Sequence, residues 1–376
     1  MSSQILARFP SGMIVLGLLI HIEAIFDSYG AAGLVLAATS MGQAIAGPIT
    51  SRLMGRLGAR PILITTTLVC AASLVAIALI DMPLTGYVLV GLLGGLSYPP
   101  VQPAVRTMYP KLVEPARLPR LFSLDASAQE IIWVMGPLVI TVVSLQVSPV
   151  VGLLLCATLL VFGGVWFIGS PELGEVRFAP STGHFGAVLK RGPVLLATAS
   201  GFLLVGSTAA IEAAIVRRFG EGGVQAGVIL GVMSLASLVA GFAFGHRQVG
   251  RYTLSMWMST LVVGGGLALL LDGFWGTLLA IAVAGLGIAP ALAVMFSLVA
   301  STIKFSESAE AYGWANTGQL VGAALGSATA GFLIDAMGSN GGFMTAVMFG
   351  VAGVVVPALG SRYREVRRHR RTALSR

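Results

Sequence analysis

Charged residues and cysteines are scarce in this chain of 376 residues. Only 10% of the residues are Asp, Glu, Lys or Arg and 56% are apolar, whereas soluble domains carry roughly 25% charged residues. Cys70 and Cys156 both fall inside apolar stretches, which argues against a disulfide framework or a zinc site. The sequence also lacks a G-x-x-x-x-G-K-[ST] loop for ATP and a His/Glu pair with metalloprotease spacing. We therefore expect neither an enzyme nor a bound cofactor, and an ion gradient as the energy source.

Long apolar stretches are what the chain has in abundance. Stretches near twenty residues fit helices that cross a bilayer, because barrel strands would be about ten residues long and alternating. No cleavage pattern follows the first stretch, so it is predicted to be a helix and not a signal peptide. The sequence predicts an all-α membrane protein with twelve transmembrane helices, near 12–29, 31–50, 61–80, 84–105, 122–145, 148–169, 193–216, 226–245, 253–271, 274–299, 311–334 and 341–360.

The two halves of the chain resemble each other. Residues 33–47 and 227–241 share glycines at both ends, 194 residues apart, and Gln129 recurs as Gln319 after 190 residues. Pro, Gly and charges of both signs fill the segment between the sixth and seventh stretches. A repeat of this kind in an apolar chain is a signature of secondary transporters, which bind substrate between the repeats. We expect two pseudo-symmetric six-helix bundles, 1–169 and 193–376, joined by a cytoplasmic linker at 170–192.

Basic residues predict the orientation of the chain. With a cytoplasmic N-terminus, twenty-one Lys and Arg fall in inside loops and the tail, Arg8 and Arg106 among them, and only Arg217 and Arg218 fall outside. This bias places both termini in the cytoplasm. It also accounts for the net charge of +8 without a nucleic-acid partner. The basic tail at 362–371 either sets this topology or contacts anionic lipid headgroups.

The loop after the second stretch carries a family motif. Residues 51–60, SRLMGRLGAR, resemble the cytoplasmic signature of the major facilitator superfamily, roughly G-x-L-x-D-R-x-G-R-R, with Gly55 in place of the acid. In that family the acid helps to latch the two bundles together on the cytoplasmic side. The resemblance therefore implies a latch that is weaker here or built otherwise. Its conformational motif comprises Arg52, Arg56, Gly58 and Arg60.

Further motifs extend the resemblance over the whole chain. Residues 245–251 look like a degenerate copy of the signature loop, and Gly136-Pro137 resembles the core of a motif found in drug–proton antiporters. Gly91 stands where the family's fourth helix usually has an arginine linked to proton coupling. The chain looks most like short proton-linked exporters of the bacterial inner membrane.

Acidic residues at membrane depth are the first candidates for function, because they are costly there and face a cavity or a bundle interior by default. Glu23 and Glu212 occupy matching positions of the first and seventh helices, where they would attract a cation or a protonated amine. The alternative is that each lies near the outer headgroups and bonds a loop. Asp27 is expected on the same helical face as Glu23, either in the cavity or as a helix-end group.

The fifth and eleventh helices carry the remaining candidates. Glu130 and Glu23 are the candidates for proton coupling. Glu130 lies deep in the fifth helix, where it would load and release the coupling proton; the alternative is a neutral acid bonded to a neighbouring helix. The side-chain amides of Gln129, Asn316 and Gln319 either bind substrate or bridge the bundles. Trp133 would provide an aromatic wall that suits an apolar or cationic solute. The expected substrate cavity comprises Glu23, Asp27, Gln129, Trp133, Glu212, Asn316 and Gln319.

Together these features predict a secondary transporter that works by alternating access as a monomer in a bacterial inner membrane. Its partners would be the lipid bilayer and a small amphipathic or cationic organic molecule, exported in exchange for protons. A proton-coupled importer of a small metabolite and a non-transporting membrane protein remain the alternatives.

Overall fold

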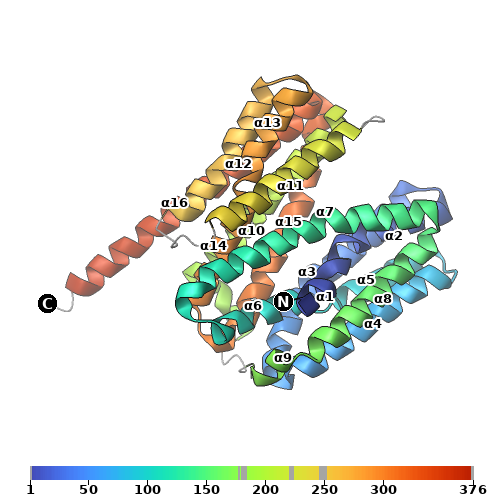
Figure 1. Ribbon diagram of the computed structural model, residues 1–376, viewed down its shortest axis with the longest axis horizontal. Helices are drawn as coiled ribbons and strands as arrows, with labels where there is room; N and C mark the ends of the chain where they lie inside the picture. The colour runs from blue at the N-terminus through green and yellow to red at the C-terminus, as the bar shows by residue number, and fades with distance from the viewer. Residues whose placement is uncertain (1, 177, 179–183, 220–223, 245–251, 374–376) are drawn as a thin grey trace. The chain divides into compact units, whose positions relative to one another are not determined.

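The computed structural model describes residues 2–176, 178, 184–219, 224–244 and 252–373 (Figure 1). Within these ranges every regular element is a helix. Short 3₁₀ segments lie at Phe9–Gly12, Pro115–Arg117 and Ala187–Lys190. The α-helices are α1 Ser2–Arg8, α2 Ile14–Phe26, α3 Tyr29–Leu57, α4 Ala59–Leu79, α5 Leu84–Leu96, α6 Val101–Leu112, α7 Leu118–Gln146, α8 Pro149–Ile168, α9 Pro171–Glu175, α10 Gly192–Phe219, α11 Val224–Phe244, α12 Thr253–Leu270, α13 Gly273–Gly285, α14 Ile288–Thr302, α15 Phe305–Met337 and α16 Ser339–Ala373.

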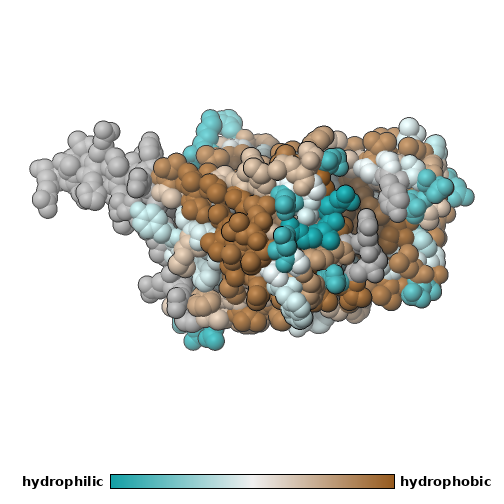
Figure 2. Space-filling model, turned by 90° about the horizontal axis from the view of Figure 1, so that it is seen from above, coloured by the Kyte–Doolittle hydropathy of each residue, from teal (hydrophilic) through white to brown (hydrophobic). Residues whose placement is uncertain are grey.

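Twelve spans in the described residues are long and apolar enough to cross a membrane, which confirms the predicted number. Large apolar side chains such as Leu89, Trp275 and Phe332 are exposed, and brown hydrophobic residues cover much of the surface in Figure 2. Soluble monomers rarely expose so much apolar area. The chain is therefore a multi-pass membrane protein.

Three spans are each built from two helices, and these breaks follow local sequence. The first span, Ser2–Phe26, contains the 3₁₀ segment with Pro10 between α1 and α2. The fourth, Leu84–Leu112, breaks before Pro99 and Pro100, which cannot donate backbone hydrogen bonds. The tenth span breaks between α13 and α14, at the repeat-related place.

The repeat is visible in packing as well as in sequence. A Cβ on Gly95 of α5 would collide with the backbone oxygen of Thr39 in α3, and one on Gly285 of α13 would collide with that of Met233 in α11. Both pairs correspond through the sequence repeat. Glycine at each place lets two helix backbones touch, so the repeated glycines preserve one helix contact in both halves.

The chain divides into two compact units, each with segments from both halves of the sequence. The first comprises Met1–Glu114, Ala128–Val188 and Ile303–Thr317, and the second comprises Pro115–Ser127, Leu189–Thr302 and Gly318–Arg376. In the first unit, Thr317 of α15 donates to the carbonyl of Ala44 at 2.8 Å. In the second, Ser123 of α7 donates to the carbonyl of Gly241. The two ends of α7 and of α15 thus belong to different units.

The core of the first unit joins α2, α3, α4, α5, α7 and α8. Val35, Leu74, Ile140 and Leu153 pack together there. The buried Tyr87 meets Phe26 edge to face, with ring centroids 5.6 Å apart. Both cysteines are buried and free, as expected.

A glycine stripe joins two long helices of the second unit. Gly318, Gly322 and Gly326 recur every fourth residue on α15, and a Cβ on each would collide with the backbone of α10, at Thr198, Phe202 and Gly206 respectively. Such spacing is how transmembrane helices approach closely when no hydrophobic driving force holds them together. This crossing positions the cavity that opens farther along the same two helices.

Among the basic residues predicted in loops, Arg8 and Arg106 are those that lie inside spans and are buried. Arg8 is the last residue of α1, within the first span, and Arg106 lies in α6, within the fourth; both are buried. Their placement in inside loops was wrong, because each charge moved the apparent end of its apolar stretch. The cytoplasmic location of the termini stays a prediction. The proposed copy of the signature loop, 245–251, lies outside the described residues, as do the side chains of the basic tail.

Candidate functional site

The second unit contains a cavity of ≈ 590 Å³ between α10 and α15. This volume lies in the range of about 300–1,000 Å³ that is typical of sites for small organic ligands. One acid, one base and one hydroxyl lie among apolar side chains. The lining residues are Ala209, Glu212, Ala213, Val216, Arg217, Ser327 and Ile334.

Glu212 and Arg217 are both without a polar partner in the described part of the chain. Neither side chain makes a hydrogen bond or an ion pair with another described residue. Ionisable groups in a membrane span usually pair with one another or mark a substrate path. An acid and a base that line one cavity unpaired therefore point to a ligand. Sequence reasoning placed Glu212 here but treated Arg217 only as a loop charge.

Arg218, the next residue, has the opposite role. Its guanidinium donates to Ser339 Oγ at 3.0 Å, to the carbonyl of Ala268 at 3.0 Å and to Asn340 Oδ1 at 2.6 Å. It also lies 4.7 Å from the ring centre of Phe343. Arg218 thus fixes α10 to the ends of α12 and α16, and it leaves the cavity to its neighbour.

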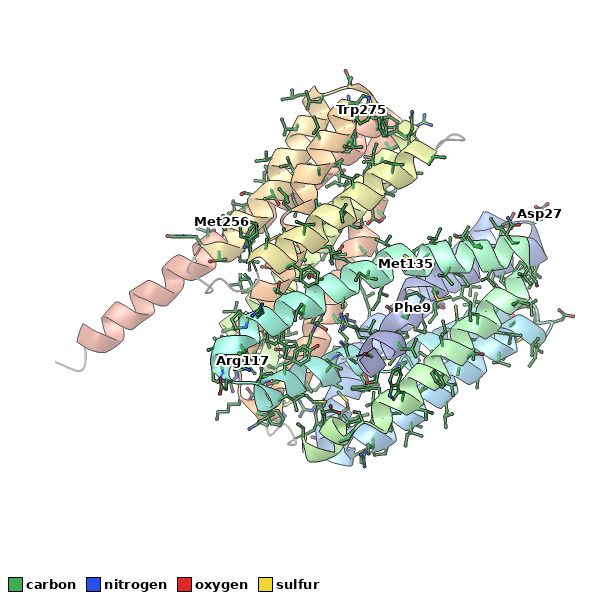
Figure 3. All side chains as sticks on the ribbon, in the orientation of Figure 1. Phe9, Asp27, Arg117, Met135, Met256 and Trp275 are labelled. Atoms are coloured by element: carbon green, nitrogen blue, oxygen red, sulfur yellow. The ribbon has the colours of Figure 1, made fainter. Side chains whose placement is uncertain are left out.

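Glu23 and Asp27 lie at the end of α2, in the first unit. Glu23 is partly buried in the last turn of the helix. Asp27 is exposed and has left-handed backbone angles (φ 48°), and its N–H donates to the Glu23 carbonyl at 2.8 Å. The helix ends at Phe26 and Asp27 is its C-cap residue at the turn into α3, which is the helix-end position given above as its alternative (Figure 3). The joint action of Glu23 and Glu212 stays a prediction.

A buried polar cluster links four elements of the first unit. Gln129 of α7 accepts from Arg106 Nη2 at 2.8 Å and from Arg8 Nη2 at 3.4 Å. The amide of Gln102 fits best when turned over, so that it accepts from both arginines and donates to Asn316 Oδ1 at 2.9 Å. The structure therefore brings together Gln129 and Asn316, two predicted cavity residues, around two arginines.

Arg106 is the residue that sequence reasoning missed in this cluster. The resemblance implies an arginine in the fourth helix at the position of Gly91, where this chain has none. The same span holds Arg106 farther along, with 1% of its surface exposed. The signal was present in the sequence as a single base followed by further apolar residues before Lys111.

The other candidates of α7 and α15 have separate surroundings. Glu130 is partly buried and has an interaction partner. Trp133 is about half exposed, with 49% of its surface accessible. Gln319 is buried and belongs to the second unit, unlike its repeat mate Gln129.

Gly136-Pro137 lies against the break in the first span. A Cβ on Gly136 would come within 2.7 Å of the carbonyl carbon of Gly12, in the 3₁₀ segment. Pro137 lies inside α7 and cannot donate to the carbonyl of Trp133, which weakens the helix there. Two locally weakened helices thus meet, in a place where only glycine allows the approach.

The signature loop contains an ion pair that its own sequence does not supply. Arg52 Nη1 lies 2.9 Å from Glu310 Oε2, and the Glu310 side chain is 1% exposed. Glu310 Oε1 also accepts from the backbone N–H of Gly186 at 2.9 Å, in the predicted linker. Gly58 joins α3 to α4 with φ 92°, a conformation that favours glycine. The motif residues Arg56 and Arg60 are exposed.

Comparison with known proteins gives one family over the whole chain. The family model described as Major Facilitator Superfamily matches residues 1–247 and 207–375. The chain is similar to the crystal structure of a bacterial homologue of the iron transporter ferroportin in an outward-facing state, with 14% identity, a TM-score of 0.76, and coverage of 96% of this chain and 98% of that one. It is also similar to the human organic anion transporter MFSD10 (TETRAN), with 17% identity, a TM-score of 0.73, and coverage of 94% and 97%. At such identities the likeness shows the fold alone. No curated protein sequence matches the chain.

Proposed function

Because the chain belongs to the major facilitator superfamily, whose members are transporters rather than enzymes, we propose that it exports a small amphipathic or cationic organic molecule in exchange for protons. It would do so as a monomer in a bacterial inner membrane. The absence of an ATP-binding loop from the sequence favours an ion gradient as the energy source.

The cavity with the unpaired Glu212 carries this proposal. Apolar side chains of α10 and α15 give an organic solute a surface to pack on, and the carboxylate attracts a positive charge into the cavity. The cavity therefore supports recognition of an amphipathic cation.

The buried contacts of the first unit support alternating access. Arg52 with Glu310, and Asn316 with the arginine–glutamine cluster, connect α15 to elements of the N-terminal half. In transporters of repeated architecture the two bundles rock around a central site. These contacts are the ones that such a motion would break and remake. Glu130 follows Gln129 of this cluster in the sequence and is partly buried. It is the proposed carrier of the coupling proton.

Transport by the purified full chain in proteoliposomes tests the proposal. A panel of permanently charged organic cations such as benzyltrimethylammonium is first screened by thermal shift, and the best stabiliser is labelled. We expect counterflow of this probe, and accumulation in vesicles with an acidic interior. Permanent charge matters, because weak amines collect in acidic vesicles without a transporter.

The matched variant Glu212→Gln should lose most of this transport while its unfolding temperature stays near that of the parent. Accumulation that requires an acidic exterior instead would identify an importer. Counterflow that no pH gradient can drive uphill would exclude proton coupling.

A further inference from the structure

We propose that the cavity between α10 and α15 binds a zwitterionic solute, with its cationic group at Glu212 and its anionic group at Arg217. This inference rests on the proposed function, since it specifies the class of molecule that the cavity takes. It narrows an amphipathic cation to a molecule with charges of both signs and an apolar body between them.

Arg217 has no polar partner among the described residues, although it lies next to the well-bonded Arg218. Its neighbour Arg218 bonds side chains and carbonyls of other helices. Arg217 instead lines the cavity, with no hydrogen bond or ion pair to another described residue.

The lining residues that α10 contributes to the cavity lie on one face of the helix. Ala209, Glu212, Ala213, Val216 and Arg217 follow the spacing i, i+3, i+4, i+7, i+8 of a single helical face. At about 100° per residue, the acid and the base lie about 140° apart around the helix, on opposite margins of this face. They are also about 7.5 Å apart along the axis. The small and apolar residues occupy the middle of the face.

A solute of one charge leaves one of the two charged groups of the cavity unmatched. A simple cation at Glu212 would leave Arg217 facing a charge of its own sign, and a simple anion at Arg217 would face Glu212. Like charges held close together repel each other. A zwitterion satisfies both groups, and one whose charges are several bonds apart suits their separation. Ile334 and Ser327 of α15, seven residues apart, complete the opposite wall.

Four probes of nearly equal size test this inference by isothermal titration calorimetry on the purified chain. They are 6-aminohexanoate, its isomer 2-aminohexanoate with adjacent charges, hexylamine and hexanoate. We expect the parent protein to bind 6-aminohexanoate about tenfold more tightly than each of the others, because a second charge-assisted contact is worth about this factor. Equal binding of 6-aminohexanoate and hexylamine by the parent would overturn the inference.

Charge variants assign the two ends of the solute. Glu212→Gln should lower the affinity for 6-aminohexanoate to that for hexanoate, and Arg217→Gln should lower it to that for hexylamine. Arg217→Lys should retain most of the preference, which separates loss of charge from loss of folding. Equal weakening of all four probes by both neutral variants would also overturn the inference.

Counterflow separates this inference from the proposed function. Tenfold tighter binding of 6-aminohexanoate without counterflow of any probe would support the zwitterion site and refute the transport proposal. Counterflow of benzyltrimethylammonium without preference for 6-aminohexanoate would leave transport and refute the zwitterion site.

Discussion

Arg52 and Glu310, 258 residues apart in sequence, form an ion pair of 2.9 Å. The family signature has an acid at the place of Gly55, within the same loop motif. Here the acid that meets the motif arginine comes from α15, and it also holds the backbone of Gly186. If this pair acts as the latch that the resemblance implies, its acid comes from a different part of the chain.

Removing the acid of this pair should loosen the cytoplasmic side. Glu310→Gln leaves Arg52 without its charge partner, at a cost of about 3 kcal/mol for a buried pair. A cysteine at Thr50, in a chain whose Cys70 and Cys156 are replaced by alanine, should then react faster with a water-soluble maleimide. Ser40→Ala, which changes an exposed side chain of the same helix outside the motif, is the control. Equal labelling rates in Glu310→Gln and the parent would contradict a latch.

Glu130 is the predicted carrier of the coupling proton. Glu130→Gln mimics the protonated acid permanently, so it should abolish accumulation driven by a pH gradient and leave energy-independent exchange largely intact. Both rates are measured in the same proteoliposomes, and Glu130→Asp serves as the control that keeps the charge. Full gradient-driven transport by the Gln variant, with an unshifted pH dependence, would rule this out.

Arg106 should be irreplaceable by lysine. A guanidinium can donate to Gln102 and Gln129 together, whereas a single ammonium does not reproduce this planar geometry. Arg106→Lys should therefore lower the free energy of unfolding by about 1–3 kcal/mol, which is read as a lower unfolding temperature in detergent. Arg60→Lys, at an exposed position, should change little. Equal unfolding temperatures for the two variants would argue against the cluster.

The glycine stripe of α15 should tolerate no side chain. In Gly322→Ala the new methyl group meets the backbone of Phe202, and overpacking of this kind costs about 1–3 kcal/mol. Gly331→Ala is the matched control, because a Cβ there has nothing within 4 Å and the helix is the same. Comparable thermal stability of the two variants would mean that the helices separate easily at this crossing.

The number of spans and the two-fold repeat were predictable, because apolar length and repeated glycines are local properties of the sequence. Gly95 and Gly285 illustrate this, since each lies where its repeat mate predicts. The positions of Arg8 and Arg106 were not predictable in the same way. Hydropathy moves the expected helix end outward at each charge, and the amides that compensate these arginines come from other helices.

Candidate residues were predictable only in part, for the same reason. Glu212 was found because an acid at membrane depth is rare. Arg217 was not, because two adjacent arginines at a helix end resemble an ordinary topology signal. Asp27 takes the helix-end position that was one of its two predicted roles, but nothing in the neighbouring sequence predicts its left-handed backbone.

The two adjacent arginines of α10 should be under different evolutionary constraints. Arg218 stabilises the fold through contacts with Ser339, Asn340 and Phe343. Arg217 lines the cavity, and its proposed partner is the solute. In relatives that transport a different substrate, we expect position 217 to vary while position 218 stays arginine. Substitutions at position 217 would then follow changes of substrate, whereas the fold would conserve position 218.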